Sequence, residues 1–133
     1  MSRRWALVAL AALGLLLAAG TLGPPPAELI HWVVRGAHRK GADEVSYALV
    51  ESAANLALFV PAGFLLAAAR PRLSGWLVWA VCVGGSIAVE LAQTLLPDRV
   101  PSLQDVVLNS VGAGLGVLLH AVVGHRRERS AHD

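Results

Sequence analysis

The sequence predicts an all-α polytopic membrane protein, a helical bundle with four transmembrane helices. Hydrophobic residues make up 56% of its 133 residues and charged residues only 15%, whereas soluble domains carry about 25% charge. Four apolar stretches each approach the ~20 residues that a helix needs to cross a bilayer core. They cover residues 5–22, 47–69, 75–96 and 103–123. Because backbone polar groups cannot stay unpaired in lipid, we expect all four to be helical.

Residues 1–22 contain the first predicted span. Arg3 and Arg4 precede an Ala/Leu run that ends in small residues at 18–20, a pattern that a cleaved signal peptide shares. We expect an uncleaved span, because three more spans follow. The single cysteine, Cys82, lies within a later span and forms no intrachain disulfide.

Residues 23–46 are predicted to form an extracytoplasmic loop. Three consecutive prolines at 24–26 favour an extended segment. Between residues 29 and 40 apolar residues mix with basic ones. We therefore expect a loop that lies on the lipid headgroups, with Trp32 at the interface. A re-entrant substrate clamp is the alternative.

Glycine and proline mark positions of close helix contact or bending. Pro61 and Gly63 lie in the middle of the second span and predict either a kink or a broken helix that shapes a cavity. Gly112 and Gly116 form a GxxxG pair, which is typical of a close contact between membrane helices. The small residues at 84–88 in the third span permit a similar contact.

The distribution of positive charge predicts that both termini are cytoplasmic. Cytoplasmic loops carry the excess of Lys and Arg. In this orientation seven of the eleven Lys and Arg residues lie inside and four outside. The chain is then a multi-pass protein of the cell membrane, with residues 124–133 as a cytoplasmic tail. The sequence has no basic stripe interleaved with aromatic residues, so a nucleic-acid partner is not expected.

Polar side chains interrupt the last three spans in one half of the bundle. At about 1.5 Å rise per helical residue, Asn55, Glu90 and Asn109 each lie roughly 10 Å inside the outer ends of their helices. Ionisable groups in membrane spans are costly and usually face the bundle interior. The sequence therefore predicts one polar pocket that opens outward. Its residues are Glu51, Asn55, Glu90, Gln93, Arg99, Asp105 and Asn109.

The pocket admits a binding interpretation and a structural one. Arg99 lies in the turn between the last two spans, and its guanidinium suits a ligand phosphate. In the structural interpretation Arg99 pairs with Glu90 instead, and the two asparagines bridge helices. Ser102 and Asp105 then resemble a capping box that begins the last helix.

Several motifs in this order resemble the VanZ-like family of small bacterial membrane proteins. They are NLALFVPAG at 55–63, ELAQ at 90–93, Arg99, and DVVLNSVGAGLG at 105–116. The resemblance covers residues 45–123, so we take residues 47–123 as a VanZ-like core of three spans. It implies a fold of four or five spans, a link to the cell envelope, and polar motif positions at Asn55, Glu90, Gln93, Arg99, Asp105 and Asn109. Its structural positions are Pro61, Gly63, Gly112 and Gly116.

The founding member of that family is associated with low-level resistance to the glycopeptide teicoplanin. The resemblance thus implies a role related to glycopeptide resistance in bacteria. Many members also carry an Asp-Lys-x-x-His motif near their first helices. This chain has no convincing copy of that motif, and residues 38–40 resemble it only weakly.

We expect a binding protein rather than an enzyme. Its partners are membrane lipids, with a lipid-linked wall precursor or a glycopeptide as candidate ligands. One alternative is an intramembrane hydrolase or transferase with Glu90 or Asp105 as general base. Another is a proton-coupled transporter, acting as a homo-oligomer because four short helices enclose little volume.

No cofactor and no metal site are predicted. The five histidines show no paired ligand spacing, which leaves a hard cation held by Glu90 and Asp105 as an alternative. A serine protease is excluded, because Ser86 and His120 differ by roughly 12 Å in depth. A nucleophile and its base must lie within about 3 Å of each other.

Overall fold

A computed structural model describes residues 2–22, 27–42, 44–95 and 102–129. In these ranges the chain forms helices and no strand, so the all-α prediction is confirmed, with five helices. The helices are α1 (Arg3–Leu22), α2 (Ala27–His38), α3 (Tyr47–Ala69), α4 (Gly75–Gln93) and α5 (Leu103–Arg129).

Serine residues begin the last three helices. Ser46, Ser74 and Ser102 precede α3, α4 and α5. In each case the serine Oγ accepts a hydrogen bond from the backbone N–H three residues further on, at 3.2–3.3 Å. Such a cap satisfies one of the N–H groups that have no partner within the helix. The predicted cap at Ser102 is therefore confirmed.

Three of the helices are long and apolar enough to cross a membrane. They are Tyr47–Ala69, Gly75–Gln93 and Leu103–His125. In α1 the apolar stretch found among the described residues is shorter, Arg4–Leu15. The structure thus supports a multi-pass membrane protein with three spans, and the fourth span remains a prediction.

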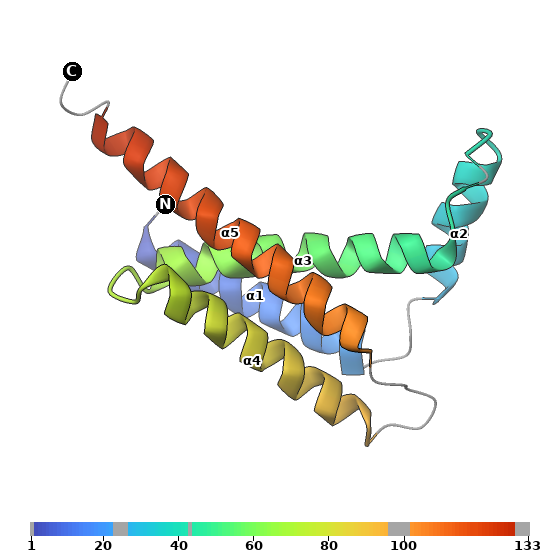
Figure 1. Cartoon of the computed structure of the whole chain (residues 1–133), viewed down its shortest axis with the longest axis horizontal. Coiled ribbons are helices and arrows are strands. Elements are labelled where there is room, and N and C mark those ends of the chain that lie inside the picture. Colours follow the sequence, from blue (N-terminus) through green and yellow to red (C-terminus); the bar gives the residue numbers. More distant parts are fainter. Residues whose placement is uncertain (1, 23–26, 43, 96–101, 130–133) are drawn as a thin grey trace.

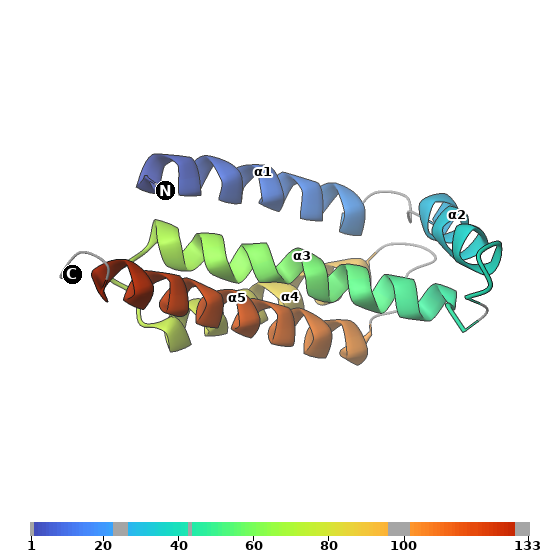
Figure 2. The same cartoon turned by 90° about the horizontal axis from the view of Figure 1, so that it is seen from above.

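Helix α3 lies at the centre of the bundle. It contacts each of the other four helices, with α1 on one side and α4 and α5 on the other (Figure 2). The four long helices alternate in direction, so α1 begins and α5 ends at the same end of the bundle (Figure 1). The opposite end carries α2, the start of α3, the end of α4 and the start of α5 (Figure 1).

Glycines allow α3 and α5 to approach each other closely. A Cβ atom on Gly112 or Gly116 would collide with the backbone carbonyl oxygen of Leu56 or Val60 in α3. A Cβ atom on Gly63 would collide with the backbone of Ala113 in the same way. Only glycine permits this backbone separation, so the predicted GxxxG contact is confirmed. Gly84 and Gly85 of α4 face open space instead.

Pro61 does not break α3. The helix is continuous from Tyr47 to Ala69, so of the two alternatives for Pro61 the broken helix is wrong. Proline removes one backbone hydrogen bond, which leaves the carbonyl of Ala57 without its usual intrahelical donor. Membrane helices tolerate this where neighbouring groups compensate. Pro61 itself is exposed at the helix surface.

The segment predicted as a loop on the headgroups contains helix α2. Ile30, Val34 and Ala37 are its buried or half-buried positions, and their i, i+4, i+7 spacing defines one helix face. The basic residues fill the opposite, exposed face. The sequence pattern of apolar and basic residues does not reveal this helix, because its apolar face extends over only about three turns.

Replacing Gly116 by alanine is expected to destabilise the bundle, because the added methyl group collides with the α3 backbone. Overpacking of this kind costs about 1–3 kcal/mol. The matched control is Gly84→Ala, where nothing lies within 4 Å of the added Cβ. Thermal unfolding in detergent, followed by circular dichroism, compares the two. Equal midpoints for both variants would contradict the close contact.

Candidate functional site

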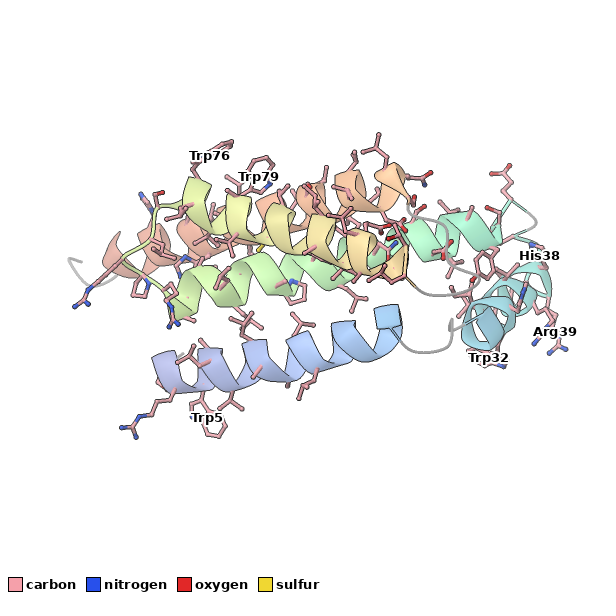
Figure 3. All side chains as sticks on the ribbon, turned by 90° about the horizontal axis from the view of Figure 1, so that it is seen from below. Trp5, Trp32, His38, Arg39, Trp76 and Trp79 are labelled. Carbon is pink, nitrogen blue, oxygen red and sulfur yellow. The ribbon has the colours of Figure 1, made fainter. Side chains whose placement is uncertain are left out.

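The buried polar side chains lie at the α2 end of the bundle. Ser86, Glu90 and Gln93 are buried on α4, and Asn109 is buried on α5. Oxygen atoms gather in this region, where α3, α4 and α5 meet (Figure 3). The structure therefore brings three of the seven predicted pocket residues into the interior of one end of the bundle. We call Ser86, Glu90, Gln93 and Asn109 the polar cluster.

Glu90 contacts the beginning of α5. Its side chain is 9% exposed, and Oε2 accepts a hydrogen bond from the backbone N–H of Ser102 at 2.8 Å. The positive end of the α5 dipole lies at this terminus, and it stabilises a carboxylate. Two side chains therefore cap α5 together: Glu90 from α4, and Ser102 from the position directly before α5.

Asn109 and Ser86 form the deepest contact of the cluster. The amide Nδ2 of Asn109 donates to Ser86 Oγ at 2.9 Å, and both side chains are buried. The Asn109 Oδ1 is also buried, and it has no hydrogen-bond partner among the described residues. Turning the amide over would leave its nitrogen unpartnered instead. Either orientation leaves one strongly polar atom in the interior that needs a partner.

Helix α3 adds a less buried polar rim. Gln104 Nε2 of α5 donates to Ser52 Oγ of α3 at 2.8 Å. Glu51 and Asn55 are half-buried one turn apart on α3. Glu51 and Gln93 each have an interaction partner. Glu51 and Asn55, the predicted pocket residues of α3, thus lie at the edge of the buried polar contacts between α4 and α5.

The remaining predicted residues lie at the start of α5 or in the preceding turn. Asp105 is half-buried in the first turn of α5, where a carboxylate is favourable. Its backbone N–H donates to Ser102 Oγ. Arg99 lies outside the described residues, so its predicted contacts remain predictions.

Ser86 is the site residue that sequence reasoning did not place. The sequence indicates Ser86 as a small contact residue and excludes it as a nucleophile, whereas the structure shows it to be the partner of Asn109. The available signal was its spacing, because Ser86, Glu90 and Gln93 follow an i, i+4, i+7 pattern on one face of α4. His120, the base of the rejected protease hypothesis, contacts Phe64 at a ring separation of 5.5 Å.

Among the described residues, the buried side-chain atom of the cluster that has no hydrogen-bond partner is an acceptor, the Asn109 carbonyl oxygen. Glu90, one turn from Ser86 on α4, is acceptor-only when ionised. No group of three metal-ligating side chains occurs in the part of the chain that the structure describes. This arrangement suits a ligand group that donates hydrogen bonds, such as a hydroxyl, an amide N–H or an ammonium.

Comparison with known proteins identifies one protein family. The chain matches the family model described as VanZ/LLP1 over residues 7–124, which includes α1 from its second turn, α2, α3, α4 and most of α5. No curated protein and no solved structure matches the chain.

Replacing Glu90 by alanine is expected to destabilise the protein. The change leaves the Ser102 N–H without its acceptor, and such a loss costs about 1–3 kcal/mol. Glu90→Gln is the matched control, because the amide oxygen of glutamine can still accept that hydrogen bond. Thermal unfolding in detergent should separate the two variants clearly. A normal midpoint for Glu90→Ala would show that the contact with Ser102 does not hold α5 in place.

Proposed function

Since this chain belongs to the VanZ/LLP1 family, we propose that it is an envelope membrane protein that binds the polar head of an amphiphile at the polar cluster. The ligand class comprises envelope lipids, lipid-linked wall precursors and glycopeptides. All of these carry hydroxyl, amide or ammonium donors next to an apolar chain. The apolar part then lies against the bundle in the bilayer while the polar part reaches the cluster.

The main support for this proposal is the side-chain oxygen of Asn109, which has no hydrogen-bond partner among the described residues. Membrane proteins gain little from a buried polar group, since interhelical hydrogen bonds are worth only about 0.6–2 kcal/mol. A group that remains unpaired costs more than that. Asn109 donates to Ser86 but leaves its carbonyl oxygen without a partner among the described residues. A donor from a bound molecule supplies the missing hydrogen bond.

The role of Glu90 supports binding over general-base catalysis. One of its carboxylate oxygens accepts the Ser102 N–H at 2.8 Å, so the side chain is fixed at the entrance of α5. A fixed carboxylate orients a ligand donor without moving a proton. Arg99 remains the proposed partner of a ligand phosphate or carboxylate, and Asp105 lies half-buried one helical turn nearer the surface than Asn109.

We place four spans in the cell membrane with both termini cytoplasmic. Helix α1 has 20 residues and a length of about 30 Å, and it packs along α3. In this orientation the polar cluster lies in the outer half of the bundle, on the side of the membrane where wall precursors and glycopeptides are found. A role in glycopeptide resistance follows if such a ligand is held there.

A double variant, Ser86→Ala with Asn109→Leu, tests the binding role. It removes both partners of one hydrogen bond, which is nearly neutral for stability, and it also removes the unpartnered oxygen. We expect the folded variant to lose at least tenfold in retention of the ligand. Native mass spectrometry of protein purified with bacterial envelope lipid extract, and separately with teicoplanin, measures the retained species.

Gln104→Leu with Ser52→Ala is the matched control. It removes an equivalent side-chain hydrogen bond from the exposed rim and should leave retention unchanged. If wild type and both double variants retain the same species in the same amounts, the polar cluster is a structural network. A chemically altered lipid in the wild-type sample would instead favour a hydrolase or transferase.

A further inference from the structure

We propose that α2 is a docking site for the headgroup of an anionic phospholipid in the leaflet on the α2 side of the bundle. The site consists of Trp32, Arg35 and Arg39. It is separate from the polar cluster, and it does not rest on the function proposed for that cluster.

One face of α2 fixes the helix to the bundle. Ile30 is 7% exposed, and Val34 lies on the same face. The His31 ring lies 5.1 Å from the ring of Tyr47 at the start of α3. The His38 Nε2 and the backbone oxygen of Val45 are hydrogen-bonded at 2.8 Å. Helix α2 is therefore held at both of its ends, crosswise to α3 (Figures 1 and 2).

The crosswise orientation places α2 along the membrane surface. Helix α3 is one of the candidate spans, so a helix that lies across its end runs along the plane of the bilayer. Because the apolar face of α2 packs on the bundle, the opposite face is the one that lies open at the headgroup level. Tryptophan is enriched at the same level, and Trp32 is 68% exposed to the outside of the bundle.

The exposed face of α2 combines an aromatic ring with two guanidinium groups. Trp32, Arg35 and Arg39 follow an i, i+3, i+7 spacing, which places them on one side of a helix. All three are exposed, and Trp32 and Arg39 both project from the bundle end (Figure 3). Lys40 follows as a further exposed cation. Of the acidic residues near this face in the chain, Glu28 lies in α2 one turn before Trp32, and Glu44 lies in the turn that leads to α3.

This combination selects a phosphodiester anion. Arginine binds phosphate through paired hydrogen bonds that a zwitterionic surface satisfies less well, because its own ammonium competes. The crosswise orientation of α2 places the backbone of Arg35 and Arg39 at a similar depth, on the helix side that carries Trp32. The occupant is therefore a lipid with net negative charge whose headgroup lies between Trp32 and the two arginines.

The test uses the full chain in detergent micelles that contain phosphatidylglycerol and phosphatidylcholine in equal amounts. Native mass spectrometry measures the ratio of the two lipids retained. We expect the wild-type chain to retain more phosphatidylglycerol than phosphatidylcholine. In the double variant Arg35→Gln with Arg39→Gln, this ratio should fall by roughly fivefold for each arginine removed. The charge-matched control is Arg70→Gln with Arg72→Gln at the other end of the bundle. An equal fall in both variants, or no excess on wild type, overturns the proposal.

A second measurement leaves both arginines in place. Brominated phosphatidylglycerol should quench the tryptophan fluorescence of the wild-type chain more than brominated phosphatidylcholine does. Trp32→Phe should abolish that difference, whereas Trp76→Phe, which removes an exposed ring at the opposite end, should preserve it. A difference that survives in Trp32→Phe contradicts docking on α2.

Discussion

Polar groups buried between membrane helices must find partners on each other, and this constraint fixes how α4 lies against α5. Among the described residues, three hydrogen bonds between α4 and the α5 segment follow one another in antiparallel order. Trp79 Nε1 donates to the backbone oxygen of Ser110 at 2.8 Å, Asn109 donates to Ser86, and Ser102 donates to Glu90. A shift of one residue along either helix breaks all three contacts. Such a shift costs more than any one of them is worth.

Helix α5 meets its two neighbours through different chemistry. Toward α3 it presents glycines, so that the backbones touch. Toward α4 it presents Asn109 and the carbonyl of Ser110, which accepts the hydrogen bond from Trp79 Nε1. The close packing on one side makes the polar positions on the other side rigid. Asn109 Oδ1 has no hydrogen-bond partner among the described residues, and the rigid packing around it leaves little conformational entropy to be lost when a donor binds there, as we propose.

The spans, the polar end and the cap at Ser102 were predictable because each has a local signature in the sequence. The length of an apolar run, the depth of a polar residue, and a serine before an apolar run can each be determined from the sequence of one helix alone. The partner of Asn109 was not predictable in this way, because it depends on how two helices are placed relative to each other. The helix in α2 was not predicted, because its packing against α3 outweighs the weak local preferences of a short, mixed segment.

The most direct test of this account measures the contact between Asn109 and Ser86 in a bilayer. The chain has only two asparagines, so selective labelling of asparagine side-chain nitrogen gives two signals in solid-state nuclear magnetic resonance. The account predicts a dipolar coupling between one of these nitrogens and the Cβ of a serine, which disappears in Ser86→Ala. A coupling that is absent from wild type, or that persists in Ser86→Ala, would contradict the convergence of α4 and α5 on a shared polar cluster.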